Sequence, residues 1–202
     1  GEAPDLHEWS RELAERVPEV IPFGGVHVAD DDPLGVAQEA VEEYGMAGFK
    51  FHPMVQGFDP WDNRLRRVLS YCEAAGLPIV LHTGYDHEYG HSYDRVGLEA
   101  MLEMYPGMPV VLSHMGFPDI GWAFSLAERH SQVWLDLTNV PGSFELMNDP
   151  EKLLDEFRTG MARHRDRFLM GTDYPAGMGN LNEILSQFDS LGIEGSLLDH
   201  VM

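Results

Sequence analysis

The sequence predicts an α/β fold of repeated strand and helix units, which is a TIM-type (β/α)8 barrel that lacks its first strands in this chain. Short apolar runs alternate with longer segments of helical period. Lys50, His82 and His114 follow one another at intervals of 32 residues. An eight-unit barrel of ~250 residues has about 31 residues per unit. An open doubly wound sheet is the alternative, and it would bring ligands to the same strand ends.

The expected strands and helix boundaries follow from apolar runs and from proline and glycine positions. Strands are predicted near residues 20–28, 46–52, 78–83, 109–114, 133–138 and 168–173. Helices are predicted to start at Asp32-Pro33, Asp59-Pro60 and Asp149-Pro150 and to end at Gly45, Gly76 and Gly107. Between 61 and 75 the apolar residues keep to one helical face, which predicts a helix packed on the sheet.

The opening helix is expected from Leu6 to about Val17, where Leu6, Trp9, Leu13 and Val17 form an apolar stripe. In an eight-stranded barrel this helix would follow the second strand and its stripe would cover the third. Six strands leave the barrel two short. We therefore expect residues 1–202 to be a single barrel domain that is truncated at both ends.

The composition excludes several classes of partner. The chain has 34 acidic residues against 13 basic residues and a formal charge of −21, which disfavours nucleic acid and anionic membrane as partners. No run approaches the ~18 apolar residues of a membrane helix, and the start lacks a secretory signal. The single cysteine, Cys72, excludes an internal disulfide and is expected to be a buried, inert thiol. We expect a soluble, cytoplasmic protein.

Polar residues recur at the carboxyl ends of the predicted strands, where functional residues collect in this architecture. They are Lys50, His52, His82, His114, Asp136 and Asp173. One histidine after a strand is usually a packed core residue, but several at equivalent strand ends indicate a metal site. Imidazole and carboxylate together suit zinc, manganese or iron(II).

Four motifs resemble a known family. They are GFKFHP at 48–53, LPIVLHTG at 77–84, VLSHMG at 111–116 and MGTDYP at 170–175. In this order they resemble the amidohydrolase superfamily, and more narrowly its amidohydrolase-related branch. That branch contains lactonases, other hydrolases, and the nonoxidative decarboxylases related to aminocarboxymuconate semialdehyde decarboxylase. The resemblance runs from about Ile21 to Tyr174 and leaves the substrate open.

The resemblance implies roles for three strand-end residues. His82 resembles the fifth-strand metal ligand, and Asp173 the eighth-strand aspartate that binds metal and handles a proton. His114 resembles the sixth-strand histidine, which binds metal in binuclear members and polarises substrate or assists proton transfer in mononuclear ones. The family's first-strand His-x-His pair has no counterpart in this sequence.

Lys50 lies where some members of the superfamily carry a carboxylated lysine between two metals. We favour a single metal and expect Lys50, His52 and Tyr174 to contact the substrate. An ion pair between Lys50 and Asp136 is the structural alternative for the lysine, and Asp136 is expected to be structural. The cluster of aromatic and polar residues between Tyr85 and Tyr93 is a candidate substrate rim.

The leading functional hypothesis is metal-dependent hydrolysis of a small ester, lactone or amide. Asp173 would take the proton of a metal-activated water, and His114 would stabilise developing negative charge. The expected cofactor is Zn²⁺, with Mn²⁺ or Fe²⁺ as alternatives. A nonoxidative decarboxylase, a lyase acting on an aromatic or unsaturated carboxylic acid, is the second hypothesis. A non-catalytic remnant that binds small molecules is the third, and a homo-oligomer stays open.

Overall fold

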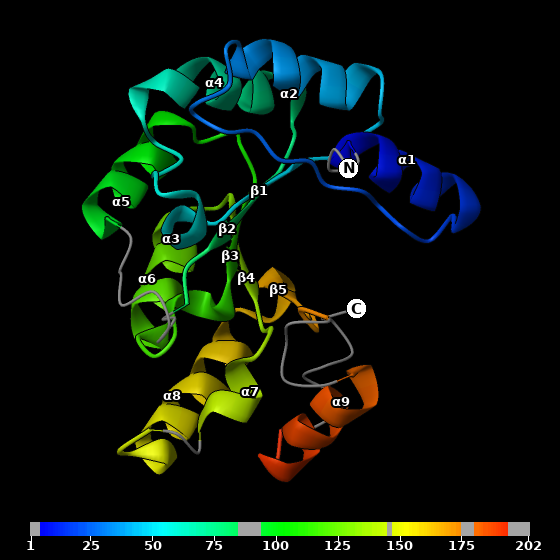
Figure 1. The fold of residues 1–202 in the computed structure, drawn as a ribbon. Helices are drawn as coiled ribbons and strands as arrows, with labels where there is room; N and C mark the ends of the chain where they lie inside the picture. The colour runs from blue at the N-terminus through cyan, green and yellow to red at the C-terminus, as the bar shows by residue number, and fades with distance from the viewer. Residues whose placement is uncertain (1–4, 85–93, 145–146, 175–179, 194–202) are drawn as a thin grey trace. The chain divides into compact units, whose positions relative to one another are not determined.

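The computed structural model describes residues 5–84, 94–144, 147–174 and 180–193 (Figure 1). The chain divides into two compact units. The first comprises Gly1–His82 and Tyr89–Val110, and the second comprises Thr83–Glu88 and Val111–Met202. Within the described residues, no helix combines the length and the apolar character needed to cross a membrane.

The first unit is built on two parallel strands. Its elements are α1 (Leu6–Arg16), α2 (Pro33–Glu42), β1 (Phe49–Phe51), α3 (Pro53–Gln56), η1 (Asn63–Leu65), α4 (Arg66–Ala75), β2 (Ile79–His82) and α5 (Arg95–Met104). β1 pairs with β2 in parallel, with Lys50 opposite Val80. Gly24 adds one parallel bridge to Phe49, so the strand predicted near 20–28 is reduced to a single residue.

The burial of alternate side chains along β1 and β2 shows on which face of the strands the core of this unit lies. Phe49 and Phe51 in β1, with Ile79 and Leu81 in β2, are buried. Successive side chains of a strand point to opposite faces, so Lys50 lies on the other face of the sheet. On α4 the buried residues Val68, Leu69 and Cys72 keep to one helical face, as the sequence predicts. Gly76 ends this helix with φ 67°, a conformation that glycine adopts without strain.

One boundary prediction and one packing prediction for the first unit differ from the structure. Asp59-Pro60 does not start a helix. Instead Asp62 caps η1, because its side chain accepts hydrogen bonds from both the backbone and the guanidinium of Arg64. The opening helix is confirmed as α1, but its predicted packing is wrong, because no residue of α1 is buried. Leu6 and Trp9 are exposed.

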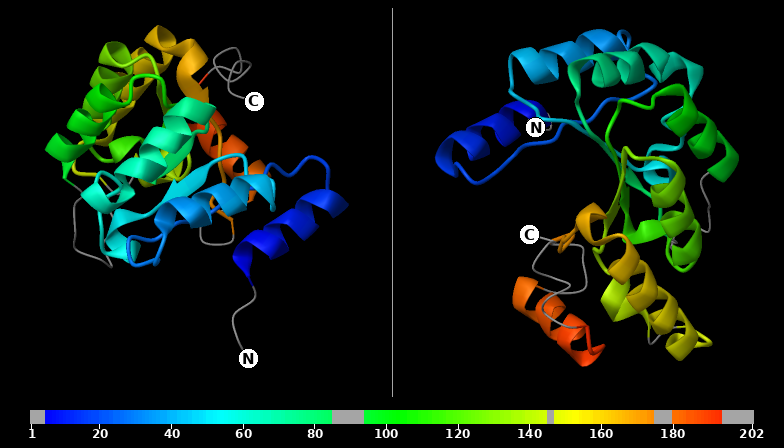
Figure 2. Two further views of the ribbon diagram at one scale, coloured as in Figure 1. Left: turned by 90° about the horizontal axis from the view of Figure 1, so that it is seen from above. Right: turned by 180° about the vertical axis from the view of Figure 1, so that it is seen from behind.

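The second unit repeats the strand and helix pattern. It holds most of β3 (Val110–Ser113), followed by η2 (His114–Gly116), α6 (Ile120–Arg129), β4 (Val133–Asp136), α7 (Val140–Ser143), α8 (Pro150–Arg163), η4 (Arg165–Arg167), β5 (Phe168–Leu169) and α9 (Leu181–Ser190). Its strand order is β3-β4-β5, and β4 pairs with β5 in parallel. α6 and α8 lie side by side in the view from behind (Figure 2).

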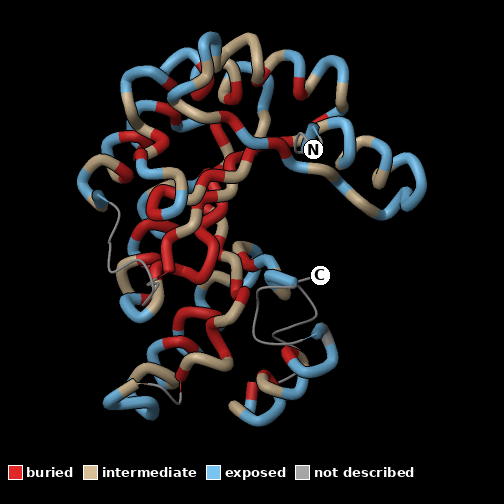
Figure 3. The backbone as a smooth tube through the Cα atoms, viewed as in Figure 1, coloured by how far each residue is buried: buried red, intermediate tan, exposed pale blue. Residues whose placement is uncertain are grey.

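The buried residues of the second unit gather on β3, β4 and the inner face of α6 (Figure 3). Every residue of β3 is buried, which is typical of a parallel strand covered on both faces. Asp149 caps α8 and Pro150 begins it, as the sequence predicts. Over the described residues of both units, five of the six predicted strands are present, as β1 to β5. Each is shorter than the apolar run that predicts it.

Candidate active site at the strand ends

In the first unit, three predicted site residues lie on β1 and β2 or directly after them. Lys50 is the middle residue of β1, His52 is the N-cap residue of α3, and His82 is the last residue of β2. The imidazole rings of His52 and His82 stack with centroids 3.7 Å apart and planes 15° from parallel. The structure therefore brings these two histidines into contact at the carboxyl ends of neighbouring strands.

In the second unit, His114 follows β3 directly and is buried. Its Nδ1 lies 2.9 Å from the backbone carbonyl oxygen of Thr138. A carbonyl oxygen only accepts hydrogen bonds, so Nδ1 must carry the hydrogen, and in the neutral ring the lone pair lies on Nε2. Metal-binding histidines are oriented by this kind of bond from the second ring nitrogen.

The position of His114 is also fixed by Thr83 and Gly84 of the same unit. The Thr83 hydroxyl donates to the Ser113 carbonyl at 2.7 Å and accepts from the Gly116 amide at 3.0 Å. A Cβ at Gly84 would lie 2.9 Å from the His114 Cβ. Glycine at position 84 therefore allows the chain to pass this close to the histidine.

Asp136 holds Thr138 in place. Its Oδ1 accepts from the Thr138 amide at 3.0 Å and from the Thr138 hydroxyl at 2.6 Å. Since the Thr138 carbonyl receives the His114 ring, these bonds connect the end of β4 to the orientation of His114. This is the structural role expected for Asp136, while its ion pair with Lys50 stays a prediction.

Asp173 and Tyr174 follow β5. The Asp173 side chain is exposed, and its Oδ2 accepts from Nδ2 of Asn139 at 3.3 Å. Tyr174 is 80% exposed, and its backbone amide donates to the Thr172 hydroxyl. The carboxylate of Asp173 is thus within reach of solvent and of one orienting amide group.

Backbone strain is concentrated at these strand ends. Among the described residues other than glycine, those with positive φ are His114 (63°), Met115 (52°), Asn139 (62°) and Asp173 (52°). Each follows β3, β4 or β5 within a few residues. Such conformations cost on the order of 1–3 kcal/mol each and cluster at active sites and ligand clamps. This strain makes the strand ends of the second unit a candidate functional region.

The donor chemistry of the predicted ligands suits a divalent metal, because His82 and His114 supply imidazole nitrogens and Asp173 supplies a carboxylate. The orientation of His114 by a backbone carbonyl supports this interpretation. In the part of the chain that the structure describes, no three His, Cys, Asp or Glu side chains form a group that could hold a metal ion. The shared cavity of the five predicted residues stays a prediction, and the predicted rim at 85–93 lies outside the described residues.

Sequence reasoning missed Thr138 and Asn139. Thr138 is the last residue of the strand predicted near 133–138 and Asn139 follows it, so both lie at the same kind of position as the chosen candidates. Asparagine ahead of Val140-Pro141-Gly142 is a turn or cap signal, and asparagine is one of the few residues that tolerate positive φ. That signal could have identified Asn139 as a residue with a special conformation.

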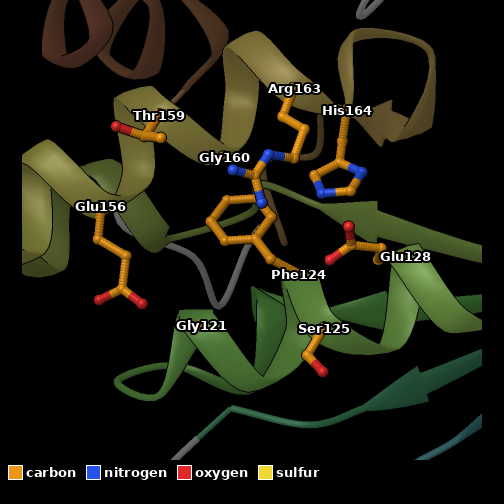
Figure 4. A pocket seen from close by; sticks show the side chains of 9 residues that line it. All are labelled: Gly121, Phe124, Ser125, Glu128, Glu156, Thr159, Gly160, Arg163 and His164. Atoms are coloured by element: carbon orange, nitrogen blue, oxygen red, sulfur yellow. The ribbon is translucent and has the colours of Figure 1, made fainter.

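A separate cavity of about 300 Å³ lies between α6 and α8 in the second unit (Figure 4). It is lined by Gly121, Phe124, Ser125, Glu128, Glu156, Thr159, Gly160, Arg163 and His164, and it contains none of the predicted site residues. The ring of His164 stacks on Phe124 with centroids 5.7 Å apart. Burial lowers the pKa of His164 below its usual value.

Comparison with known proteins decides the family. The family model described as amidohydrolase matches residues 2–177. The chain belongs to the amidohydrolase family. The resemblance inferred from the four motifs is therefore confirmed, while no curated protein matches the chain.

Solved structures extend this amidohydrolase assignment to the fold. An uncharacterised TIM-barrel protein from Bordetella bronchiseptica shares 23% identity with a TM-score of 0.77, covering 96% of this chain and 68% of that one. A probable 2-pyrone-4,6-dicarboxylic acid hydrolase from Acinetobacter baumannii, with citric acid bound, shares 14% (TM-score 0.65; 95% and 73% covered). A 5-carboxyvanillate decarboxylase from Novosphingobium aromaticivorans, with bound manganese, also shares 14% (TM-score 0.64; 96% and 66% covered). The chain has the α/β fold of TIM-barrel enzymes, as the sequence predicts.

Proposed function

We propose that this amidohydrolase is a metal-dependent enzyme that hydrolyses a small ester, lactone or amide. The observation that carries the proposal is the bond from His114 Nδ1 to the Thr138 carbonyl, which fixes the tautomer and the orientation of this ring at the end of β3. A histidine fixed in one tautomer by the backbone is suited to bind a metal or a proton.

His82 and Asp173 are the residues we assign to the metal, with His114 as a third ligand if the site is binuclear. Zn²⁺ is the cofactor we favour, and the manganese in the Novosphingobium relative supports a divalent ion of this class. Such an ion polarises a carbonyl group and lowers the pKa of a bound water.

The chain's own residues would handle the proton and the negative charge. Asp173 is an exposed carboxylate with an orienting amide, so it can accept a proton from the attacking water. His114 donates to a substrate oxygen only as imidazolium, since Nδ1 already donates to Thr138. In a mononuclear site, His114 would take up a proton before it stabilises the negative charge.

Lys50, His52 and Tyr174 are the residues we assign to the substrate. A lysine ammonium at the strand ends can neutralise a substrate carboxylate. The compounds named for two relatives, 2-pyrone-4,6-dicarboxylic acid and 5-carboxyvanillate, both carry carboxyl groups. We therefore favour a substrate with a free carboxylate beside the ester, lactone or amide that is cleaved.

Nonoxidative decarboxylation is the second candidate, and the Novosphingobium decarboxylase of the same fold favours it. In that reaction the same groups would protonate the carbon that loses carbon dioxide. Binding without catalysis is the third candidate. The cytoplasmic location, the homo-oligomer and the single barrel domain of residues 1–202 stay predictions.

Metal analysis of the purified protein, followed by assays with the metal found, tests these candidates. The panel contains carboxylated lactones, esters and amides beside aromatic acids. We expect release of acid from one of the hydrolysable compounds without carbon dioxide. Release of carbon dioxide from an aromatic acid would replace hydrolysis by decarboxylation. Absence of bound metal and of both activities would leave only the binding candidate.

A further inference from the structure

Asn139 occupies a position that its usual structural role does not explain. It is the N-cap residue of α7, yet its side chain makes no capping hydrogen bond to that helix. Asparagine is favoured at N-caps because its side-chain oxygen accepts a bond from the backbone of the first turn. Its backbone is left-handed, with φ 62°. The choice of asparagine here needs another reason.

The side chain of Asn139 is directed instead to the end of the next strand. Its Nδ2 donates to Oδ2 of Asp173 at 3.3 Å. Asparagine meets two requirements at once, because it tolerates positive φ and supplies an amide donor. Glycine would meet only the first requirement, and alanine would meet neither.

The backbones that carry these two side chains are held close together. Leu137, two residues before Asn139, donates its amide to the Leu169 carbonyl at 2.9 Å. Gly171, two residues before Asp173, lies so close to Thr138 that a Cβ there would overlap the Thr138 hydroxyl oxygen. The contact between Asn139 and Asp173 therefore rests on a supported backbone and not on two independent loops.

We propose that Asn139 is a positioning residue for Asp173. Its amide fixes the carboxylate by holding Oδ2, and Oδ1 is then the oxygen that we assign to the metal or to the proton of water. The neighbouring residue Thr138 orients His114, so one short segment after β4 sets both candidate catalytic groups of the second unit. This inference rests on the proposed function.

A spectroscopic experiment tests the contact without any metal or substrate. The side-chain amide signal of Asn139 is assigned in ¹⁵N NMR spectra by its loss in Asn139→Gly. Asp173→Gly then removes the acceptor while it keeps a residue that adopts positive φ freely. We expect the Asn139 amide signal to shift and its hydrogen exchange to become faster. An unchanged signal in Asp173→Gly would overturn the proposal.

Titration with Mn²⁺ tests the positioning role. Asn139→Gly removes the amide but keeps the backbone conformation accessible, and we expect Mn²⁺ affinity to fall ~10–100-fold, as is typical for loss of a group that orients a ligand. Asn182→Gly is the matched control, because it makes the same change at an exposed residue of α9. The thermal midpoints are measured in parallel.

Wild-type affinity in Asn139→Gly, or an equal loss in Asn182→Gly, would overturn the positioning role. If the unmodified protein binds neither Mn²⁺ nor Zn²⁺, the proposed metal-dependent function fails, and the NMR comparison alone decides whether Asn139 holds Asp173.

Discussion

The segments after β3, β4 and β5 in the second unit and helix α1 in the first unit follow opposite patterns. α1 has good local signals. Asp5 caps its first turn, and Arg11 and Glu15 form an ion pair one turn apart, yet none of its residues is buried. The strand-end segments contain non-glycine residues with positive φ, which local preference disfavours, and His114 and Met115 among them are buried.

This difference shows where tertiary structure controls the backbone. The cap and the ion pair of α1 are signals within its own sequence, and neither depends on whether the apolar stripe is covered. A left-handed histidine or aspartate persists only where surrounding contacts fix it. The bond from His114 to Thr138 and the bond from Asn139 to Asp173 are such contacts. Strained backbone that is held by specific contacts is therefore a better guide to a candidate functional segment than the exposed apolar stripe of α1.

The largest expected effect is on catalysis at a strained strand end. Asp173→Asn keeps the size of the side chain but removes its charge and its proton-accepting ability. We expect turnover at saturating metal to fall at least ~10²-fold. Asp166→Asn is the control, because it makes the same change at an exposed residue of η4 in the same unit. Near-normal turnover in Asp173→Asn would contradict the assigned role.

A pair of leucines compares packing in α4 with packing in α1. Leu69 is 1% exposed, whereas Leu6 is 71% exposed. We expect Leu69→Ala to lower the free energy of unfolding by ~2–5 kcal/mol and Leu6→Ala to change it by less than ~0.5 kcal/mol. Denaturant titration of both variants measures these values. Comparable losses would show that the stripe of α1 is covered in solution.

Gly171→Ala tests the close approach that supports Asp173. The new Cβ would overlap the Thr138 hydroxyl oxygen and lie 3.1 Å from Oδ1 of Asp136. We expect a loss of ~1–3 kcal/mol in the free energy of unfolding, the usual cost of overpacking. Gly25→Ala is the control, because a Cβ there has no atom within 4 Å. Equal thermal midpoints for the two variants would refute the predicted clash.

The smallest expected effect is the pH dependence that comes from His164. Burial against Phe124 lowers its pKa from the usual 6.5. The unfolded chain then binds the proton more readily than the folded one, so this contribution to stability is present above pH 6.5 and is lost as the pH falls towards the folded pKa. His164→Gln should flatten the curve of thermal midpoint against pH just below 6.5. An identical slope in this variant would assign the dependence to other groups.

The sequence predicts strands and helix boundaries well where the signal is local. Apolar runs locate β1 to β5, Asp149-Pro150 starts α8, and Gly76 ends α4. Asp59-Pro60 misled because a second aspartate three residues later, Asp62, has Arg64 to complete a cap. The apolar stripe of α1 misled because periodicity shows which face of a helix is apolar, but not whether that face is covered.

The candidate site was also predictable only in part, because some of its contacts join residues far apart in the sequence. His114 and Asp173 could be chosen because they follow apolar runs within family-like motifs. Their orienting partners Thr138 and Asn139 could not, because the contacts join residues 24 and 34 positions apart. The positive φ of Asp173 also could not be predicted from the adjacent sequence. The close approach of Gly171 to Thr138, which supports this backbone, joins two segments that are far apart in the sequence.

The single cysteine, Cys72, can be used to measure how often the first unit opens. Cys72 lies in the packed face of α4 with no exposed surface, and burial raises the pKa of its thiol to about 12. A thiol-modifying reagent can therefore react only with molecules in which the packing around Cys72 has opened. Because the chain has no other cysteine, the rate of labelling reports the opening of the structure around this one residue, local or global, without an introduced probe.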